Sequence, residues 1–89
     1  MLNYKTLRVP LRRPMRLYVE YGINPGSFLT AVLCNQLFQS FANADAWNLA
    51  AMQSIVGWVY DEMPSTIWGD PERVASHINQ KAKERGKQQ

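Results

Sequence analysis

Apolar residues recur at helical spacing in the second half of this chain, and this periodicity is what most limits its possible folds. Successive members of the stripe lie three or four positions apart, at Leu49, Met52, Val56, Val59 and Met63. That spacing places their side chains on one side of an α-helix. Asp45 is a suitable N-cap and Pro64 a suitable stop, so we expect one helix between them. Gly57 costs such a helix about 1 kcal/mol relative to alanine, which predicts that a neighbouring backbone packs closely there.

An earlier apolar stripe predicts a second long helix. Its members recur at every fourth residue, at Leu29, Leu33, Leu37 and Phe41. Asn24 followed by Pro25 suits the start of this helix, and Ser27 offers an alternative cap one turn later. We expect the helix to run to about Ala42. The Gly- and Pro-rich start also suggests a phosphate-binding loop. Because neither of the glycine patterns that bind nucleotides is present, a helix start is the better interpretation.

A shorter helix is expected to begin at Pro14 and to end at Gly22, which tolerates the left-handed conformation of a helix stop. An alternation of apolar residues in the same segment is also compatible with a strand, at Leu17, Val19 and Tyr21. We prefer the helix. Residues 1–13 are expected to form a partly extended arm, because Pro10 and Pro14 interrupt any long element.

The last helix has the clearest start signal in the chain. Asp70 is a suitable N-cap, and Pro71 is a suitable first helical residue. Glu72 adds a carboxylate where the helix dipole is positive. We expect the helix to fray past Arg85 and to continue into a C-terminal tail at residues 86–89.

Together these segments predict an all-α fold: a small bundle of three to four helices with a basic, partly extended N-terminal arm and a basic C-terminal tail. The helical domain would span residues 14–85. The loop that precedes the last helix carries Ile67 and Trp68, which we expect to fold back over the core. At 89 residues the chain makes one domain with a modest core, which leaves a homo-oligomer open.

Composition excludes several classes of protein. Hydrophobic residues make up 46% of the chain, which excludes wholesale disorder. No apolar run approaches the roughly 18–20 residues that span a membrane, so we expect no membrane insertion. Arginines interrupt the region in which a signal peptide would be apolar, at Arg12, Arg13 and Arg16. We therefore expect the protein to stay inside the cell that makes it.

The sequence predicts no catalytic or metal-binding set. Cys34 is the only cysteine and His77 the only histidine, which are too few ligands for a metal site of their kind. We expect Cys34 to be a small buried hydrophobic residue and His77 to be a satisfied or solvated helix residue. The carboxylate pairs at 61–62 and at 70 and 72 are explained by a solvent-exposed face and by helix capping. We therefore expect no enzymatic activity and no cofactor.

Charge is divided into three blocks along the chain. Residues 1–16 contain five bases and no acid, residues 17–72 six acids and no base, and residues 73–89 five bases and one acid. The basic ends suit contact with nucleic-acid phosphates, and Tyr4 and Tyr18 suit stacking on bases. The candidate nucleic-acid-binding residues are Lys5, Arg8, Arg12, Arg13, Arg16, Lys81, Lys83, Arg85 and Lys87. A second interpretation is that the basic ends only balance the acidic middle and keep the protein dissolved.

Most of the central sequence resembles a family of short phage proteins. The runs YVEYGINPGSFLTAVLCNQLFQSFANADAWN and IVGWVYDEMPSTIWGDPERV follow the family's motifs Y-V-x-x-G-x-x-P-G-S/G-F-L-x-A-V-L-x-N-x-L, A-D-x-x-N and P-x-x-x-W-G-x-P-E-x-V. The resemblance extends from Tyr18 to about Val74. The chain departs from the pattern at Gln36, where the family usually has Asp, and at Asp70, where Ser is common. This family is the small non-structural protein, often called protein C, of the gokushovirus branch of the single-stranded-DNA microviruses.

The resemblance implies a role in the host cytoplasm when viral DNA replication switches to packaging. The protein would engage the replicative DNA complex and help to route new single strands into procapsids. The implied partners are single-stranded or replicative DNA, or the replication and procapsid proteins. The basic segment before Tyr18 lies outside the resemblance, so no family role carries over to Arg12 or Arg13.

Two alternative functions remain from the residues themselves. One is a protein-interaction module whose acidic body binds a host or phage protein, as an inhibitor or an assembly aid. The other is a small helix-turn-helix regulator. Asp45, at the start of the central helix, would repel a phosphate backbone and disfavours the regulator.

Overall fold

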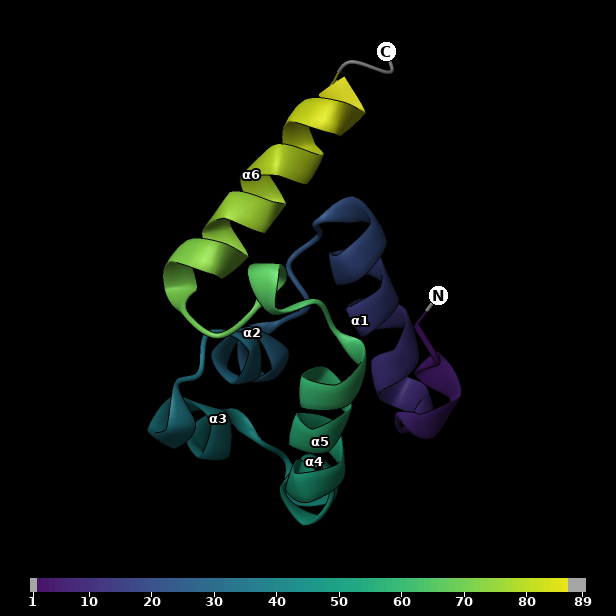
Figure 1. The fold of residues 1–89 in the computed structure, drawn as a ribbon. Helices are drawn as coiled ribbons and strands as arrows, with labels where there is room; N and C mark the ends of the chain where they lie inside the picture. The colour runs from purple at the N-terminus through teal and green to yellow at the C-terminus, as the bar shows by residue number, and fades with distance from the viewer. Residues whose placement is uncertain (1, 87–89) are drawn as a thin grey trace.

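The computed structural model describes residues 2–86, which form six α-helices and two short 3-10 helices, with no strand among them (Figure 1). In chain order the elements are η1 Tyr4–Thr6, α1 Val9–Tyr21, α2 Ser27–Leu33, α3 Leu37–Asn43, α4 Ala46–Ala50, α5 Met52–Glu62, η2 Ser65–Ile67 and α6 Pro71–Gly86. The all-α prediction is confirmed. The helices are more numerous than expected, because each of the two long helices predicted from the periodicity is divided in two.

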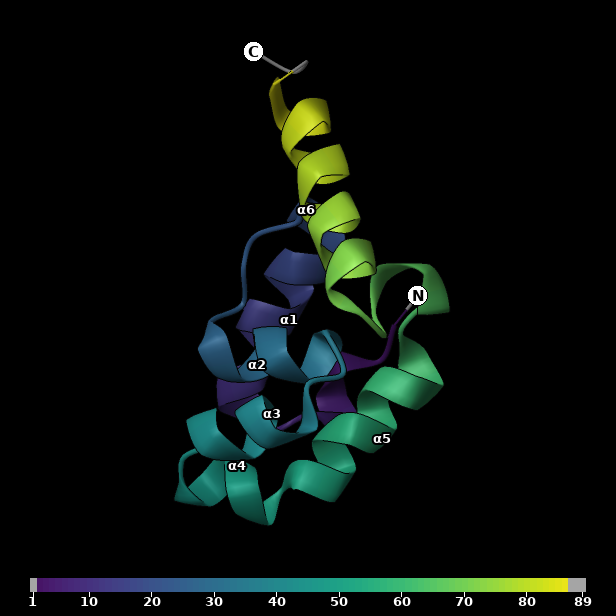
Figure 2. The same cartoon turned by 90° about the vertical axis from the view of Figure 1, so that its left-hand side faces the viewer.

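The core lies where α1, α2 and α5 face one another (Figures 1 and 2). The side chains that fill it are Leu11, Met15 and Tyr18 of α1, Phe28, Leu29, Val32 and Leu33 of α2, and Met52, Ile55, Trp58 and Val59 of α5. Val74 in the first turn of α6 adds to this core. The rest of α6 runs past the core along α1, and the molecule measures 41 × 26 × 20 Å.

The N-terminal segment is not an extended arm, contrary to the prediction. α1 begins at Val9 rather than at Pro14, which lies inside the helix. Pro10 occupies the first turn, where its missing N–H is not needed. Leu7 and Leu11 are only 3% and 7% exposed, so their burial holds this segment on the core and offsets the cost of a proline within α1.

Hydrogen bonds to α5 also fix the N-terminal segment. The indole Nε1 of Trp58 donates to the carbonyl oxygen of Asn3 at 2.7 Å, and the Asn3 N–H donates to the Glu62 carboxylate at 2.9 Å. The Tyr4 ring packs against Trp58, with their centroids 5.4 Å apart. These contacts join positions that lie more than fifty residues apart in the sequence.

The start of α2 also differs from the prediction. The helix begins at Ser27, and Gly26 precedes it with φ at 98°. Asn24 does not cap the helix; its side-chain oxygen accepts hydrogen bonds from the Gly26 N–H at 2.8 Å and from the Thr30 hydroxyl at 3.1 Å. The Gly- and Pro-rich stretch therefore forms an Asx turn that leads into α2.

A left-handed residue separates α2 from α3, where one continuous helix was predicted. Asn35 has φ at 60°. Its N–H donates to the carbonyl of Val32, and the Gln36 N–H donates to that of Ala31, at 3.1 and 2.9 Å. This pair of bonds is a Schellman stop, and asparagine tolerates its left-handed position. The Leu33 carbonyl accepts instead from the N–H of Gly69 at 2.7 Å, so the loop before α6 secures the end of α2.

The second predicted helix is interrupted at Ala51, between α4 and α5. Asp45 caps α4 as expected, because its carboxylate accepts from the Asn48 N–H at 2.7 Å. Of the predicted stripe, Met52, Val59 and Met63 are buried, whereas Leu49 and Val56 are exposed. The expectation of close packing at Gly57 is wrong, since a side-chain carbon built there would meet nothing within 4 Å.

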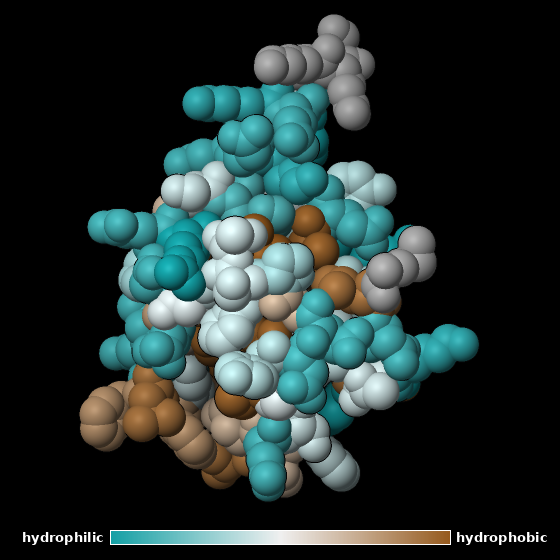
Figure 3. Space-filling view, viewed as in Figure 1, coloured by the Kyte–Doolittle hydropathy of each residue, from teal (hydrophilic) through white to brown (hydrophobic). Residues whose placement is uncertain are grey.

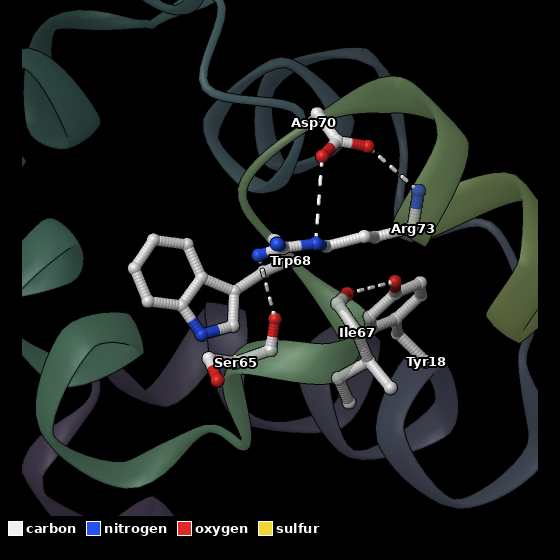
Figure 4. A network of polar contacts seen from close by, with 6 residues as sticks. All are labelled: Tyr18, Ser65, Ile67, Trp68, Asp70 and Arg73. Carbon is white, nitrogen blue, oxygen red and sulfur yellow. Dashed lines mark hydrogen bonds and ion pairs between the residues drawn. The ribbon is translucent and has the colours of Figure 1, made fainter.

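The segment before α6 folds over the core as predicted. Ile67 and Trp68 pack against core residues, and the Ile67 carbonyl accepts a hydrogen bond from the Tyr18 hydroxyl at 2.5 Å (Figure 4). Asp70 caps α6 by accepting from the Arg73 N–H at 2.9 Å. The Arg73 guanidinium lies 3.4 Å from the Asp70 carboxylate and also donates to the carbonyl of Ser65 at 3.1 Å, which holds the loop against the helix start.

Candidate nucleic-acid interface

α6 packs along α1, and the basic end of α6 lies beside the C-terminal end of α1, whereas the N-terminal bases lie at the opposite end of that helix (Figure 1). The Arg85 guanidinium donates to the carbonyl oxygen of Tyr21, a residue 64 positions earlier. Gly22, with φ at 66°, gives room to the Lys81 side chain, because a Cβ on Gly22 would lie 2.5 Å from the Lys81 Cβ. Two cations of α6 therefore lie at the C-terminal end of α1, where free carbonyl groups and the helix dipole favour positive charge.

Arg8 and Arg12 hold the N-terminal segment in place. The Arg8 guanidinium donates to the side-chain oxygen of Asn48, which joins α1 to α4. Arg12 donates to the carbonyl oxygens of Lys5 and Leu7 at 2.8 and 2.9 Å. Both arginines are half-buried. Because a guanidinium has five N–H donors, each of these residues retains donors for a phosphate.

The remaining bases of the N-terminal block face solvent. Arg16 forms an ion pair with Glu20 at 2.9 Å, and the two side chains are 65% and 41% exposed. An exposed pair of this kind contributes at most about 1 kcal/mol, so a phosphate can compete with the carboxylate. Lys5 and Arg13 are exposed, and within residues 2–86 neither side chain has a hydrogen-bond or ion-pair partner.

The C-terminal bases divide between two sides of α6. Lys81 and Arg85, four residues apart, lie on the side that faces α1. Lys81 also pairs with Glu84 at 3.4 Å. Lys83 lies between them in sequence, on the opposite side of the helix, and is exposed. Lys87 lies outside the described residues.

Two sources of positive charge coincide at the first turn of α1: the arginine side chains and the helix dipole. The turn contains no acidic residue, and Arg8, Arg12 and Arg13 lie at or next to it. The N-terminal end of a helix carries a partial positive charge of its own, so these arginines add to the potential instead of neutralising it. Without a bound anion this arrangement destabilises the helix start, and it attracts anions such as phosphate.

The aromatic residues expected to stack on bases are not available for that role. Tyr18 is completely buried; burial raises the pKa of its phenol, and its hydroxyl is bonded to Ile67. Tyr4 is half-buried, and burial followed by the nearby Glu20 carboxylate raises its pKa. Two other aromatic rings, those of Tyr21 and Trp47, are exposed next to basic residues.

Tyr21 is exposed beside Arg85, and the Arg8 guanidinium lies 5.9 Å from the centre of the exposed Trp47 ring. The sequence does not reveal either pairing, because both join distant segments.

Acidic residues of the middle block act mainly inside the fold. Asp45 and Asp70 cap helices, and Glu62 binds the N-terminal backbone. Glu20 pairs with Arg16, and Asp61 and Glu72 are the exposed acids of this block that make none of these contacts among the described residues. The consecutive short helices α2 and α3 do not suit a DNA-reading pair, because α3 contains no lysine or arginine to contact phosphate.

His77 and Cys34, the residues whose side chains are most often catalytic or metal-binding, are both packed within the fold. His77 donates a hydrogen bond from Nε2 to the Tyr18 carbonyl oxygen at 2.7 Å and packs on the Tyr18 ring, so it is a satisfied residue. Cys34 is buried as predicted, and burial, with the Asp70 charge, raises the pKa of its thiol. Residues 2–86 bring no three potential metal ligands together. None of their helices has the length and apolar character needed to cross a membrane.

None of the protein-family models compared with the chain matches it, and neither does any curated protein sequence or any solved structure. The resemblance to the gokushovirus protein therefore rests on the sequence motifs themselves. The basic residues at α1 and α6 are the structural feature on which a functional proposal can be built.

Proposed function

We propose that this chain is a non-enzymatic phage protein that binds viral DNA or its replication complex and acts when replication switches to packaging into procapsids. The motifs between Tyr18 and Val74 support the phage role, since they resemble the small non-structural protein of gokushoviruses. The basic residues support contact with nucleic acid. This function needs no cofactor, because positively charged side chains alone provide the affinity.

The observation that carries the proposal is the concentration of uncompensated positive charge at the start of α1. Arg8, Arg12 and Arg13 adjoin a helix end that is itself positive, and the first turn has no acid to balance them. Exposed Lys5 and Arg16 add to this charge. A second group of bases, Lys81, Lys83 and Arg85, belongs to the part of α6 that reaches the other end of α1, of which Lys83 and Arg85 are exposed. A flexible single strand can follow such a surface more readily than a rigid duplex, and Tyr21 offers a ring for stacking.

Binding of a labelled single-stranded oligonucleotide, measured by fluorescence anisotropy, tests the proposal. We expect retention at about 50 mM salt and a steep loss of affinity as salt rises. Arg13→Gln and Lys83→Gln should each weaken binding and reduce the salt slope by about 1. These two side chains are suitable because they are exposed and, within residues 2–86, form no hydrogen bond or ion pair.

Arg73→Gln is the matched control, because it removes the same charge from the first turn of α6, which lies outside the two groups of candidate bases. Its salt slope should stay that of the unmodified protein. No binding at low salt, or equal losses in all three variants, would refute a defined nucleic-acid surface. The packaging role is tested separately in infected cells, where loss of the protein should reduce packaged single strands while duplex replicative DNA persists.

A further inference from the structure

A group of large apolar side chains lies uncovered on α3 and α5. We call it the apolar face and define it by Leu37, Phe38, Phe41, Val56 and Tyr60. Their exposed fractions run from 46% for Phe41 to 87% for Phe38. Hydrophobic side chains gather over α3 and α4 at the lower left of the molecule, whereas α6 above them is hydrophilic (Figure 3). The Schellman stop at Asn35 causes this exposure, because it turns α3 away from the core that α2 lines.

A groove runs through the apolar face. It encloses about 180 Å³ between α3 and α5, and buried core residues form its floor, at Val32, Met52 and Val59. Leu37, Phe41, Val56 and Tyr60 form its walls. A cavity of about 150 Å³ with an apolar lining binds benzene, so this groove has room for one phenyl ring.

Phe38 is the most exposed large apolar residue of the chain among those that the structure describes. It follows the wall residue Leu37 on α3 but does not line the groove. About 100° separates successive side chains around a helix, so Phe38 projects beside the groove of its own molecule. A ring and a groove that fits a ring therefore lie next to each other on one face.

We propose that the apolar face is the interface of a two-fold symmetric homodimer, in which Phe38 of each copy enters the groove of the other. A two-fold interface requires a surface that is complementary to itself, and a knob beside a matching hole meets this condition. This inference does not depend on the nucleic-acid function.

Charge favours a second copy of this chain as the occupant. Between Ile23 and Tyr60 the sequence contains a single charged residue, Asp45. The apolar face therefore meets its own copy without like charges opposite each other, which would cost several kcal/mol. The surfaces of α1 and α6 suit a symmetric interface less well, because their exposed bases would face the same bases of the second copy.

The available area is also close to what a stable dimer needs. At about 150–250 Å² for each large side chain, the exposed fractions of the five residues amount to roughly 600 Å² of apolar surface per copy. A standard interface buries about 800 Å² on each partner, polar rim included. Asn35 and Gln36 border the groove and can supply part of that rim.

Helix length gives an independent reason for a partner on this side. α3 has seven residues and α4 five, and Ser40 is the only residue in the two helices that is buried. Isolated helices shorter than about 12–15 residues are marginal in water. Burial of Leu37, Phe38 and Phe41 against a second copy would give α3 the packing that its own molecule does not provide.

Sedimentation equilibrium of the full chain, without nucleic acid, tests the dimer. We expect a reversible monomer–dimer equilibrium at micromolar concentration. Phe38→Asp and Val56→Asp, on the knob and on the groove wall, should each weaken dimerisation at least tenfold. Val9→Asp is the matched control, since Val9 is exposed but lies on α1, and it should leave the equilibrium unchanged. Circular dichroism checks that each variant keeps the helical content of the unmodified protein.

A second measurement places the contact independently of those variants. A mixture of Phe38→Cys and Val56→Cys proteins should form a disulfide between unlike chains on mild oxidation, whereas a mixture of Val9→Cys and Val56→Cys should not. A protein that stays monomeric at every concentration, a dimer that Phe38→Asp leaves intact, or an apolar face that instead binds a different protein as a monomer would each overturn the proposal.

Discussion

Single residues decide where this chain departs from its simple periodicity, and several of them are polar groups at the edge of the core. Tyr18 is the clearest example. The sequence suggests a ring that stacks on bases, and it gives no indication of what the hydroxyl contacts. In the structure the hydroxyl donates to Ile67 at 2.5 Å and so links α1 to the loop before α6. Figure 4 shows this bond next to the Arg73 and Asp70 contacts that hold the same loop.

The Tyr18 hydroxyl should make stability depend on alkaline pH. Burial raises its pKa in the folded protein above the value of about 10 expected in the unfolded chain. The resulting stabilisation is fully present below pH 10. Above that, the unfolded chain releases the proton while the folded protein keeps it, and stability falls by up to about 1.4 kcal/mol per pH unit.

Tyr18→Phe isolates this contribution in urea unfolding experiments. At pH 8 the variant should be less stable by about 1 kcal/mol, because one hydrogen bond is lost. At about pH 11 the difference should shrink or reverse, since the variant has no phenol to ionise at this position. Parallel loss of stability in both proteins would show that another group governs the alkaline transition.

At the scale of elements, the ends of helices are set by local chemistry that the sequence displays only in part. Asp45 and Asp70 are capping residues by type, and both cap the helices expected of them. The apolar stripe from Leu29 to Phe41 continues across Asn35, so the periodicity predicts no stop there. Asparagine is the residue other than glycine that most readily accepts a left-handed conformation, so this signal was present in the sequence.

Two glycines in different settings should respond oppositely to alanine. Gly22 ends α1 with φ at 66°, and a Cβ there would lie 2.5 Å from the Lys81 Cβ, so Gly22→Ala should destabilise the protein by about 1–2 kcal/mol or more. Gly57 lies inside α5 with open space around it, so Gly57→Ala should stabilise it by about 0.5–1 kcal/mol. Thermal unfolding measures both changes, and a gain in stability for Gly22→Ala would contradict the close contact between α1 and α6.

At the scale of the whole molecule, the N-terminal segment belongs to the fold and not to an appendage. Leu7 closes the core beside Leu11, and Asn3 bonds to α5. The bases of this segment are therefore presented on a folded surface at fixed positions. Removal of residues 1–13 would expose the core and could not separate a binding defect from unfolding, which is why point variants are the better test of nucleic-acid contact.

Leu7→Ala measures how strongly the segment supports the fold. The side chain is 3% exposed, so its truncation should cost about 3 kcal/mol. Val9→Ala, two residues later and largely exposed, should change stability by less than about 0.5 kcal/mol. Equal effects of the two substitutions on urea unfolding would mean that the N-terminal segment does not pack on the core in solution.

The sequence by itself determined the helical class, the caps at Asp45 and Asp70, the stop at Gly22 and the burial of Cys34. These features depend on spacing and on the conformational preferences of single residues, which act over one or two turns. Only the tertiary structure decided that Leu7 and Leu11 enter the core, that two predicted helices divide, and that Tyr18 is buried while Tyr21 is exposed. It also determined which bases form hydrogen bonds within the fold, as Arg8, Arg12 and Arg85 do, and which are exposed to solvent. Each of these depends on contacts between segments far apart in the chain, where the free energy of burial and of hydrogen bonding outweighs local preference.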